Sequence, residues 1–297
     1  MRRIPISLSL LLICAALRLA AAESDSISLS NGTQIDGWIV RLTPDAALVL
    51  GDKQARKVPL ASATDIRFDL KSKPRCAVVI AGRKTSPVVV TSFRNNVLEG
   101  ATPERQPFSV ALKDISSAEF YPTAQLSRTL AVTHEKQKPD YCGEACVAMA
   151  AAYLGKSVTQ DAVNAAGGLD GKRGVYSNEL EKAISDLKLK TAPIAAAFAD
   201  RSDDDALFDR WRLIQALDRG HPVLLGIWAD YENKSANFNF DHFVLLVGYD
   251  LTKQAMIIDN PGGQKLWERT FEQFQKHRQT KTSLVYQIEF PAPEKSK

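Results

Sequence analysis

The chain has 297 residues, of which 45% are apolar and 24% are charged, and its formal net charge is +4. These values are typical of soluble globular proteins, and the length allows one large domain or two ordinary ones. Lys and Arg residues are scattered, without a dense basic run that carries interleaved aromatic residues. We therefore expect no nucleic-acid partner.

Residues 1–22 have the features of a signal peptide. Arg2 and Arg3 precede an apolar stretch at residues 4–17, which is short for a membrane span, and small residues follow at 20–22. We expect removal of this segment and export of the protein, either to the periplasm or out of the cell. No later stretch is apolar enough to cross a bilayer, so no transmembrane segment is expected after signal removal.

Removal of the signal peptide would leave Cys76, Cys142 and Cys146. An odd number of cysteines in an oxidising compartment leaves at least one free thiol. A helix would point Cys142 and Cys146 in nearly the same direction, which disfavours a disulfide, and no second Cys or His pair has zinc-finger spacing. We expect no disulfide between them, no metal site and no organic cofactor. Cys76 begins an apolar strand and is expected in the core.

Residues 24–122 have the pattern of strands and turns. Apolar and polar residues alternate, and Asn31 and Gly32 form a turn signal between two such runs. A weaker copy follows at an offset of 52 residues, which relates Leu60 to Leu112 and Phe68 to Phe120. The pattern predicts two tandem small β units, each a meander or a small barrel, or one sandwich of two halves. Without a histidine, this half is expected to be a binding, docking or spacer module with a protein or envelope partner.

Residues 122–137 are expected to join this half to a domain at 130–292, whose pattern is different. Helices are expected first and strands afterwards, which predicts a segregated α+β domain with an antiparallel sheet. The expected helices cover 142–154, a short segment capped by Ser157 or Thr159, 177–187, 205–219 and 270–278. The expected strands cover 222–228, 242–249, 255–259 and 283–290.

Cys142 is the candidate nucleophile of this domain. It begins an alanine-rich helix, and the helix dipole lowers the pKa of a thiol at that position, which favours the thiolate near neutral pH. Cys146 lies one turn inside the helix and is expected to pack in the core.

A cysteine nucleophile needs a histidine to share its proton and a third group to orient that histidine. His242 opens the most apolar strand of the chain, and Asp259 ends the next strand. Antiparallel pairing is expected to bring these two residues side by side, with Asp259 fixing the tautomer of His242. Of the other histidines, we expect His134 in the linker and His277 in solvent.

The oxyanion of an acyl-transfer reaction needs hydrogen-bond donors. The backbone amide of Cys142 is one candidate. The side chain of Gln137, five residues earlier in the chain, is the other.

These residues resemble a known family. Gln137, the run CGEACVAM at 142–149, the run HFVLLVGYD at 242–250 and the turn DNP at 259–261 are similar to the double-glycine leader peptidases that process bacteriocins, and to their stand-alone peptidase-like relatives. The resemblance covers about residues 130 to 290. It implies a papain-like cysteine peptidase with catalytic residues in the order Cys, His, Asp, and it implies a structural role for His221.

The sequence therefore predicts an exported cysteine peptidase that acts on a peptide or protein substrate. Cys142 attacks, His242 acts as base and then acid, Asp259 orients His242, and Gln137 stabilises the oxyanion. Two alternatives remain open. The same residues could serve amidase or transglutaminase-like acyl transfer, because a fold does not set the acceptor. An inactive binding protein is the other, because Tyr141 stands where the family usually has Asp.

Overall fold

The computed structural model describes residues 25–51, 55–70, 75–193, 202–230, 232, 241–263, 265–278 and 287–291. The chain divides into two compact units, Met1–Phe120 and Tyr121–Lys297, called unit 1 and unit 2 below. Both contain antiparallel sheets, and helices occur in unit 2. The predicted signal peptide lies outside the described residues. Among the helices that are described, none has the length and apolar character needed to cross a membrane.

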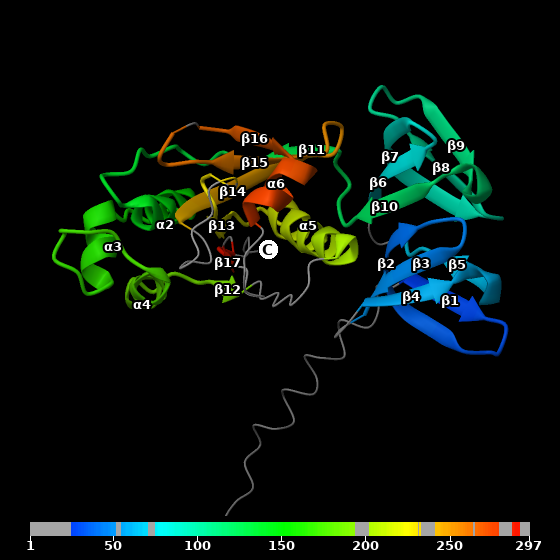
Figure 1. Ribbon diagram of the computed structural model, residues 1–297, viewed down its shortest axis with the longest axis horizontal. Helices are drawn as coiled ribbons and strands as arrows, with labels where there is room; N and C mark the ends of the chain where they lie inside the picture. The colour runs from blue at the N-terminus through cyan, green and yellow to red at the C-terminus, as the bar shows by residue number, and fades with distance from the viewer. Residues whose placement is uncertain are drawn as a thin grey trace, which may run out of the picture. The chain divides into compact units, whose positions relative to one another are not determined.

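Unit 1 consists of strands and two 3₁₀ turns in its described residues (Figure 1). The order of four strands, a 3₁₀ turn and a strand occurs twice in succession. The elements are β1 (Asp25–Leu29), β2 (Gln34–Leu42), β3 (Ala46–Leu50), β4 (Ala55–Pro59), η2 (Leu60–Ser62), β5 (Ala63–Arg67), β6 (Arg75–Ala81), β7 (Lys84–Arg94), β8 (Val97–Ala101), β9 (Pro107–Ala111), η3 (Leu112–Asp114) and β10 (Ser117–Tyr121).

The sheet of unit 1 has the strand order β4-β3-β2-β10-β6-β7-β8-β9, and β1 pairs with both β2 and β5. The predicted first hairpin is confirmed, since Asn31 and Gly32 lie in the turn between β1 and β2. Gly32 has a φ of +82°, a conformation that glycine adopts without strain. Strand β10 pairs with β2 of the first half through Ala118 and Glu119, which joins the two halves in one sheet.

A buried ion pair links the first strands of the two halves of unit 1. The Arg75 Nη1 donates to Asp25 Oδ2 at 2.5 Å, and both side chains are at most 2% exposed. The carboxylate also accepts from the backbone amides of Ile39 and Asp69, and the guanidinium lies 4.4 Å from the centre of the Trp38 ring. Burial raises the pKa of Asp25, although the charge of Arg75 opposes that rise. Cys76 beside this pair is fully buried, as predicted.

Unit 2 contains helices followed by strands, as predicted, and its sheet is antiparallel in every described pairing (Figure 1). Its strand order is β12-β17-β13-β14-β15-β16. The helices are α2 (Cys142–Tyr153), α3 (Gln160–Ala166), α4 (Ser177–Asp186), α5 (Asp203–Asp218) and α6 (Phe271–Arg278). The strands are β11 (Ser127–Thr129), β12 (Ala192–Pro193), β13 (Val223–Ile227), β14 (His242–Asp250), β15 (Ala255–Asp259), β16 (Trp267–Thr270) and β17 (Gln287–Glu289).

The predicted join at residues 122–137 is part of unit 2. Strand β11 pairs with the second half of β14, where Arg128 lies opposite Tyr249. Strands β11, β12 and β16 were not predicted, because segments of two to four residues are too short to show an alternation. Helix caps were predicted better: the Thr159 hydroxyl accepts from Ala162 N, and Gly155 ends α2 with a φ of +78°.

Helix α2 is buried along most of its length, including every residue from Gly143 to Ala151. Alanine-rich helices of this kind pack closely, because small side chains let the backbone approach a sheet. A Cβ on Gly143 would lie 3.2 Å from the Phe243 ring and 3.3 Å from Leu180 and Val175. The start of α2 therefore lies against the start of β14, next to His242.

Two further histidines have buried partners. His277 was predicted in solvent, and this was wrong: it is 3% exposed and its Nδ1 lies 2.6 Å from the carbonyl oxygen of Trp228. Its ring contacts Trp267 with centroids 4.9 Å apart, so the inner face of α6 carries it into the core. His221 lies between α5 and β13, and its Nδ1 contacts Glu289 of β17.

Candidate active site

Cys142 is the first residue of α2, and its side chain is half-buried. Tyr141 precedes it as the N-cap and makes no capping side-chain hydrogen bond. Asp140 has a φ of +64°, a strained conformation for a residue other than glycine, and it turns the chain sharply into the helix. Cys146, one turn on, is fully buried as predicted. Both thiols are unpaired.

The thiol of Cys142 is held in its neutral form. Burial raises its pKa above the usual value, and a hydrogen bond from the backbone of Phe243 only partly opposes this rise. The buried carboxyl of Glu144, two residues later, raises the pKa of Cys142 further. The predicted depression of the Cys142 pKa by the helix start is therefore not found, because burial outweighs the hydrogen bonds from the backbone. A base must remove the proton before the sulfur can attack.

His242 is oriented by Asn260, which lies directly after β15. The distance from His242 Nε2 to Asn260 Oδ1 is 2.8 Å. The backbone amide of Gly262 also donates to Asn260 Oδ1, at 3.0 Å, which identifies this atom as the amide oxygen. An oxygen that only accepts requires the proton of His242 on Nε2, so Nδ1 carries a free lone pair. Burial lowers the pKa of His242, which keeps the ring neutral and able to accept a proton at Nδ1.

Asp259 does not lie beside His242, and the predicted pairing across the hairpin is wrong in register. The partner of Asp259 on β14 is Leu245, three residues beyond His242. Side chains alternate along a strand, so residues 245 and 242 point to opposite faces. The carboxylate of Asp259 instead contacts His134, with 2.5 Å between Oδ1 and Nδ1. His134 is thus tied to the sheet, and its linker position does not leave it free.

Gly262 is the centre of a group of polar side chains. A Cβ there would lie 3.1 Å from Gln137 Oε1, 3.4 Å from His242 Cε1 and 3.5 Å from Asn260 Oδ1. The backbone amide of Gln137 donates to the carbonyl oxygen of Pro261 at 3.0 Å, which fixes the residue against this turn. Its Oε1 is buried without a hydrogen-bond partner. The structure therefore brings Gln137, His242 and Asn260 together around Gly262, where a larger residue would crowd them.

A second group of side chains holds the loop in front of Cys142. The carboxyl of Glu144 accepts from Asn164 Nδ2 at 2.7 Å and from the backbone amide of Val175 at 2.9 Å. Asn164 also donates to the carbonyl oxygen of Arg173 and accepts from Gly171 N. Gly174 packs so closely that a Cβ would lie 1.9 Å from the carbonyl oxygen of Asp140.

Sequence reasoning missed the contributions of Asn260, Glu144 and Asn164. Asn260 had a signal, because it is the residue directly before Pro261 in the turn where the family has Asp before Pro. Glu144 and Asn164 had none, since charged or amide residues on helices usually face water. Among the described residues, no group of three His, Cys, Asp or Glu side chains is arranged to hold a metal ion.

A helix that starts at a cysteine and packs on a strand that starts at a histidine indicates a cysteine-peptidase type of site. Comparison with known families agrees: residues 129–284, more than half of the chain, match the model of the peptidase C39-like family. The chain belongs to this family. No curated protein matches it.

Two solved structures are similar to the chain. One is the peptidase domain of Streptococcus ComA, a bifunctional ABC transporter involved in a quorum-sensing pathway, which is 16% identical in sequence. The match covers 56% of this chain and 98% of that one, with a TM-score of 0.37. The other is a double-glycine-motif protease from an AMS/PCAT transporter in complex with the leader peptide, which is 20% identical in sequence. The match covers 55% of this chain and 94% of that one, with a TM-score of 0.36.

Proposed function

We propose that unit 2 is a papain-like cysteine peptidase that hydrolyses peptide bonds. The observation that carries the proposal is the contact between His242 Nε2 and Asn260 Oδ1, because it leaves Nδ1 available to accept a proton. The backbone amide of Phe243, the residue after His242, hydrogen-bonds to the Cys142 sulfur, which supports a role for these two residues in one site.

The reaction begins when His242 Nδ1 accepts the thiol proton and Cys142 Sγ forms a bond to the peptide carbonyl carbon. The tetrahedral intermediate collapses, the C–N bond breaks, and the imidazolium gives its proton to the leaving amine. Water then attacks the thioester as His242 again takes a proton. The carboxylic acid leaves, and the returned proton restores the thiol. Since both groups are neutral at rest, this is general-base catalysis and not attack by a preformed thiolate.

Asn260 takes the orienting role that the sequence analysis gave to Asp259. Its oxygen is fixed by Gly262 N and holds one tautomer of His242. Asp259 acts on His134, which ties the segment before Gln137 to the sheet. The backbone amide of Cys142 and the Gln137 amide group form the oxyanion hole. The position of Gln137 at the Gly262 turn supports this role.

The remaining parts of the chain complete the proposal. Residues 1–22 direct export and are then removed. Unit 1 is a tandem duplication, for three reasons. The element order recurs. Both β2 and β7 carry a bulge, at Ile39–Arg41 and Val90–Ser92, 51 residues apart. The rings of Phe68 and Phe120, equivalent residues at an offset of 52, lie 4.9 Å apart, as expected at a pseudo-two-fold axis.

The test compares the mature protein with Cys142→Ala and with Cys146→Ala as the matched control. The substrates are fluorescein-labelled casein and a mixture of internally quenched peptides, and iodoacetamide labelling identifies the reactive thiol. We expect hydrolysis by the wild type and by Cys146→Ala, none by Cys142→Ala, and labelling at Cys142 that is lost in His242→Ala.

Two outcomes would replace the proposal. If methylamine diverts the product from the acid to the amide as the main reaction, the protein is an acyl transferase. If neither substrate is cut and Cys142 is labelled no faster than the buried Cys76, unit 2 is an inactive binding protein.

A further inference from the structure

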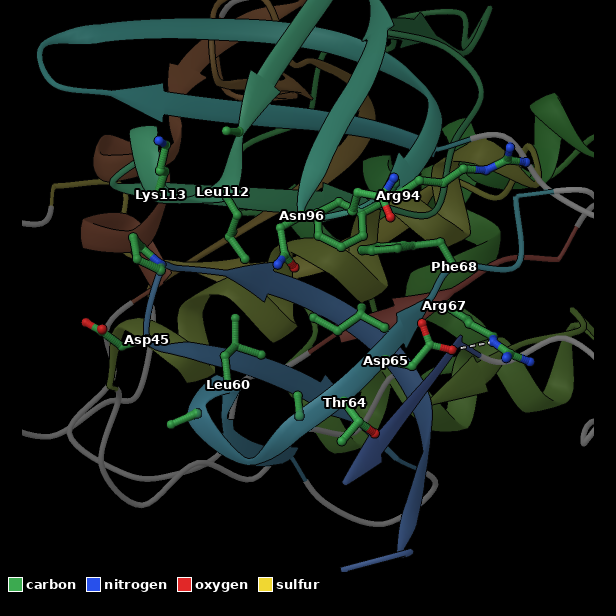
Figure 2. Close-up of a pocket in the computed structure, with 17 residues that line it drawn as sticks. Asp45, Leu60, Thr64, Asp65, Arg67, Phe68, Arg94, Asn96, Leu112 and Lys113 are labelled. Atoms are coloured by element: carbon green, nitrogen blue, oxygen red, sulfur yellow. Dashed lines mark hydrogen bonds and ion pairs between the residues drawn. The ribbon is translucent and has the colours of Figure 1, made fainter. Parts of the chain in front are cut away.

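A groove of about 1250 Å³ opens in unit 1, between its two halves. Figure 2 shows Asp45, Leu60 and Thr64 of the first half on one side, and Asn96, Leu112 and Lys113 of the second half on the other. Its apolar lining includes Phe68 and Phe93, whose ring centres lie 5.5 Å apart. None of these residues belongs to the candidate active site, which lies in unit 2.

The two halves meet along one seam that is closed by strand pairing. Strand β10 pairs with the end of β2, where Ala118 lies opposite Leu42 and Glu119 opposite Arg41. An ion pair of 2.9 Å between Arg41 and Glu119 reinforces this seam.

The equivalent seam on the other side of the pseudo-two-fold axis is not closed by strand pairing, although β5 and β7 approach each other. There, β5 takes the place of β10 and the end of β7 takes the place of β2. Ile66 and Phe93 correspond to Ala118 and Leu42, at offsets of 52 and 51 residues, and both line the groove. Within the described strands, β5 pairs only with β1, so its other edge faces the groove.

The ion pair that closes the first seam has no counterpart in the second. Arg41 and Glu119 correspond to Ser92 and Arg67, and each of these is engaged in its own half. Ser92 donates to Glu99 at 2.5 Å, and Arg67 donates to Asp65 at 2.6 Å. The unpaired seam is therefore built into the sequence, and an unpaired edge of β5 is left beside an apolar surface. Unpaired edges are sites of strand addition.

We propose that this groove binds an extended acidic peptide, which adds a strand to the unpaired edge of β5. The closed seam shows that a strand fits at the equivalent edge of β10. Alternate side chains of the peptide would contact Phe68, Phe93 and Leu60, which lie partly buried at the edge of the core.

The charge of the rim selects an acidic sequence. Asp65 is neutralised by Arg67, while Arg94 and Lys113 are exposed and make no ion pair among the described residues. Among the described residues that line the groove, two cations without an ion pair then face one carboxylate without an ion pair, that of Asp45. This inference rests on the proposed duplication of unit 1. It does not depend on the proposed peptidase activity of unit 2.

The experiment uses the full mature chain with Cys142→Ala, which prevents cleavage and separates binding from catalysis. The probe is a fluorescein-labelled peptide of alternating valine and glutamate, followed by fluorescence anisotropy. Controls are the same peptide with alternate backbone amides N-methylated, and a peptide with lysine in place of glutamate. The variant Arg94→Glu/Lys113→Glu reverses the rim, and Arg83→Glu/Lys84→Glu is the matched change at the exposed turn between β6 and β7.

We expect saturable binding of the glutamate peptide, a loss of about tenfold or more in affinity for Arg94→Glu/Lys113→Glu, and little change for the matched variant. The N-methylated peptide should not bind, because its backbone cannot donate to β5. Equal binding of the N-methylated peptide would overturn strand addition, and equal binding by both double variants would overturn the acidic preference. Absence of binding would overturn the proposal. Sedimentation that shows a dimer broken only by Arg94→Glu/Lys113→Glu would assign the groove to a second copy.

Discussion

Two neighbouring residues at the end of β15, Asp259 and Asn260, each contact a histidine, and the surroundings of the two contacts differ. Asn260 contacts His242, and the next residue, Phe243, hydrogen-bonds through its backbone amide to the Cys142 sulfur. Asp259 holds His134 from a fully buried position and adds to the raised pKa of Cys146 in the core. A histidine with an oxygen partner therefore does not define a catalytic pair. The position of the histidine relative to the nucleophile defines that pair.

The largest expected effect separates the two histidines. His242→Ala removes the proposed base and should lower kcat/KM by about 10² to 10⁴ fold. His134→Ala removes a contact outside the chemistry and should cost less than about tenfold in the same assay. The measurement is hydrolysis of the quenched peptides at saturating and limiting substrate. Equal losses in the two variants would contradict the distinction between the two contacts.

An intermediate effect is expected for the orienting residue. Asn260→Ala should lower kcat by about tenfold to a hundredfold, because the ring of His242 loses its fixed direction while the base itself remains. Asp259→Asn keeps the size of the side chain and should change kcat much less. If Asp259→Asn lowers kcat more than Asn260→Ala, the orienting role belongs to Asp259 as the sequence first predicted.

The pH dependence of activity should sharpen the same assignment. Burial lowers the pKa of His242, so the neutral base persists to lower pH than usual, and activity is lost only as pH falls through that lowered pKa. The acid limb of kcat/KM is therefore expected below about pH 6.5. In Asn260→Asp, the new carboxylate stabilises the imidazolium and should move this limb to higher pH. An unmoved limb in Asn260→Asp would place the titrating group elsewhere.

Loss of the contact between Asp259 and His134 is expected to have the smallest effect on activity and a clear effect on stability. Asp259→Ala leaves His134 without its partner and should reduce the free energy of unfolding by about 1–3 kcal/mol. Asp186→Ala, an exposed residue on α4 that pairs with Lys182, is the matched control and should cost less than about 1 kcal/mol. Urea denaturation measures both. A null result for Asp259→Ala would show that the contact with His134 contributes nothing to the fold.

Much of unit 2 could be predicted, because its periodic segments are long and their ends carry turn residues. The helix of Cys142 and the strand of His242 were both expected near their observed positions. Register could not be predicted: the bulge between Leu246 and Gly248 sets Asp259 opposite Leu245, and the next residue, Asn260, is the one that contacts His242.

The pKa of Cys142 was also beyond the sequence. The position at a helix start was correctly predicted, but the depth of burial depends on Phe243 and on the loop held by Glu144 and Asn164. Phe243 and Asn164 are distant from Cys142 in the chain, and only the tertiary packing desolvates the thiol.

The ion pair between Asp25 and Arg75 sets a limit on how far the amino terminus can be trimmed. Asp25 is the first residue of β1, three positions after the predicted signal peptide, and its carboxylate is the counter-ion of a buried guanidinium. Loss of that residue would leave the buried guanidinium of Arg75 without a counter-ion and would lower the free energy of unfolding by about 3–5 kcal/mol. An exopeptidase that removes one residue too many would therefore weaken unit 1, and a chain designed to begin after Asp25 would carry the same defect from synthesis.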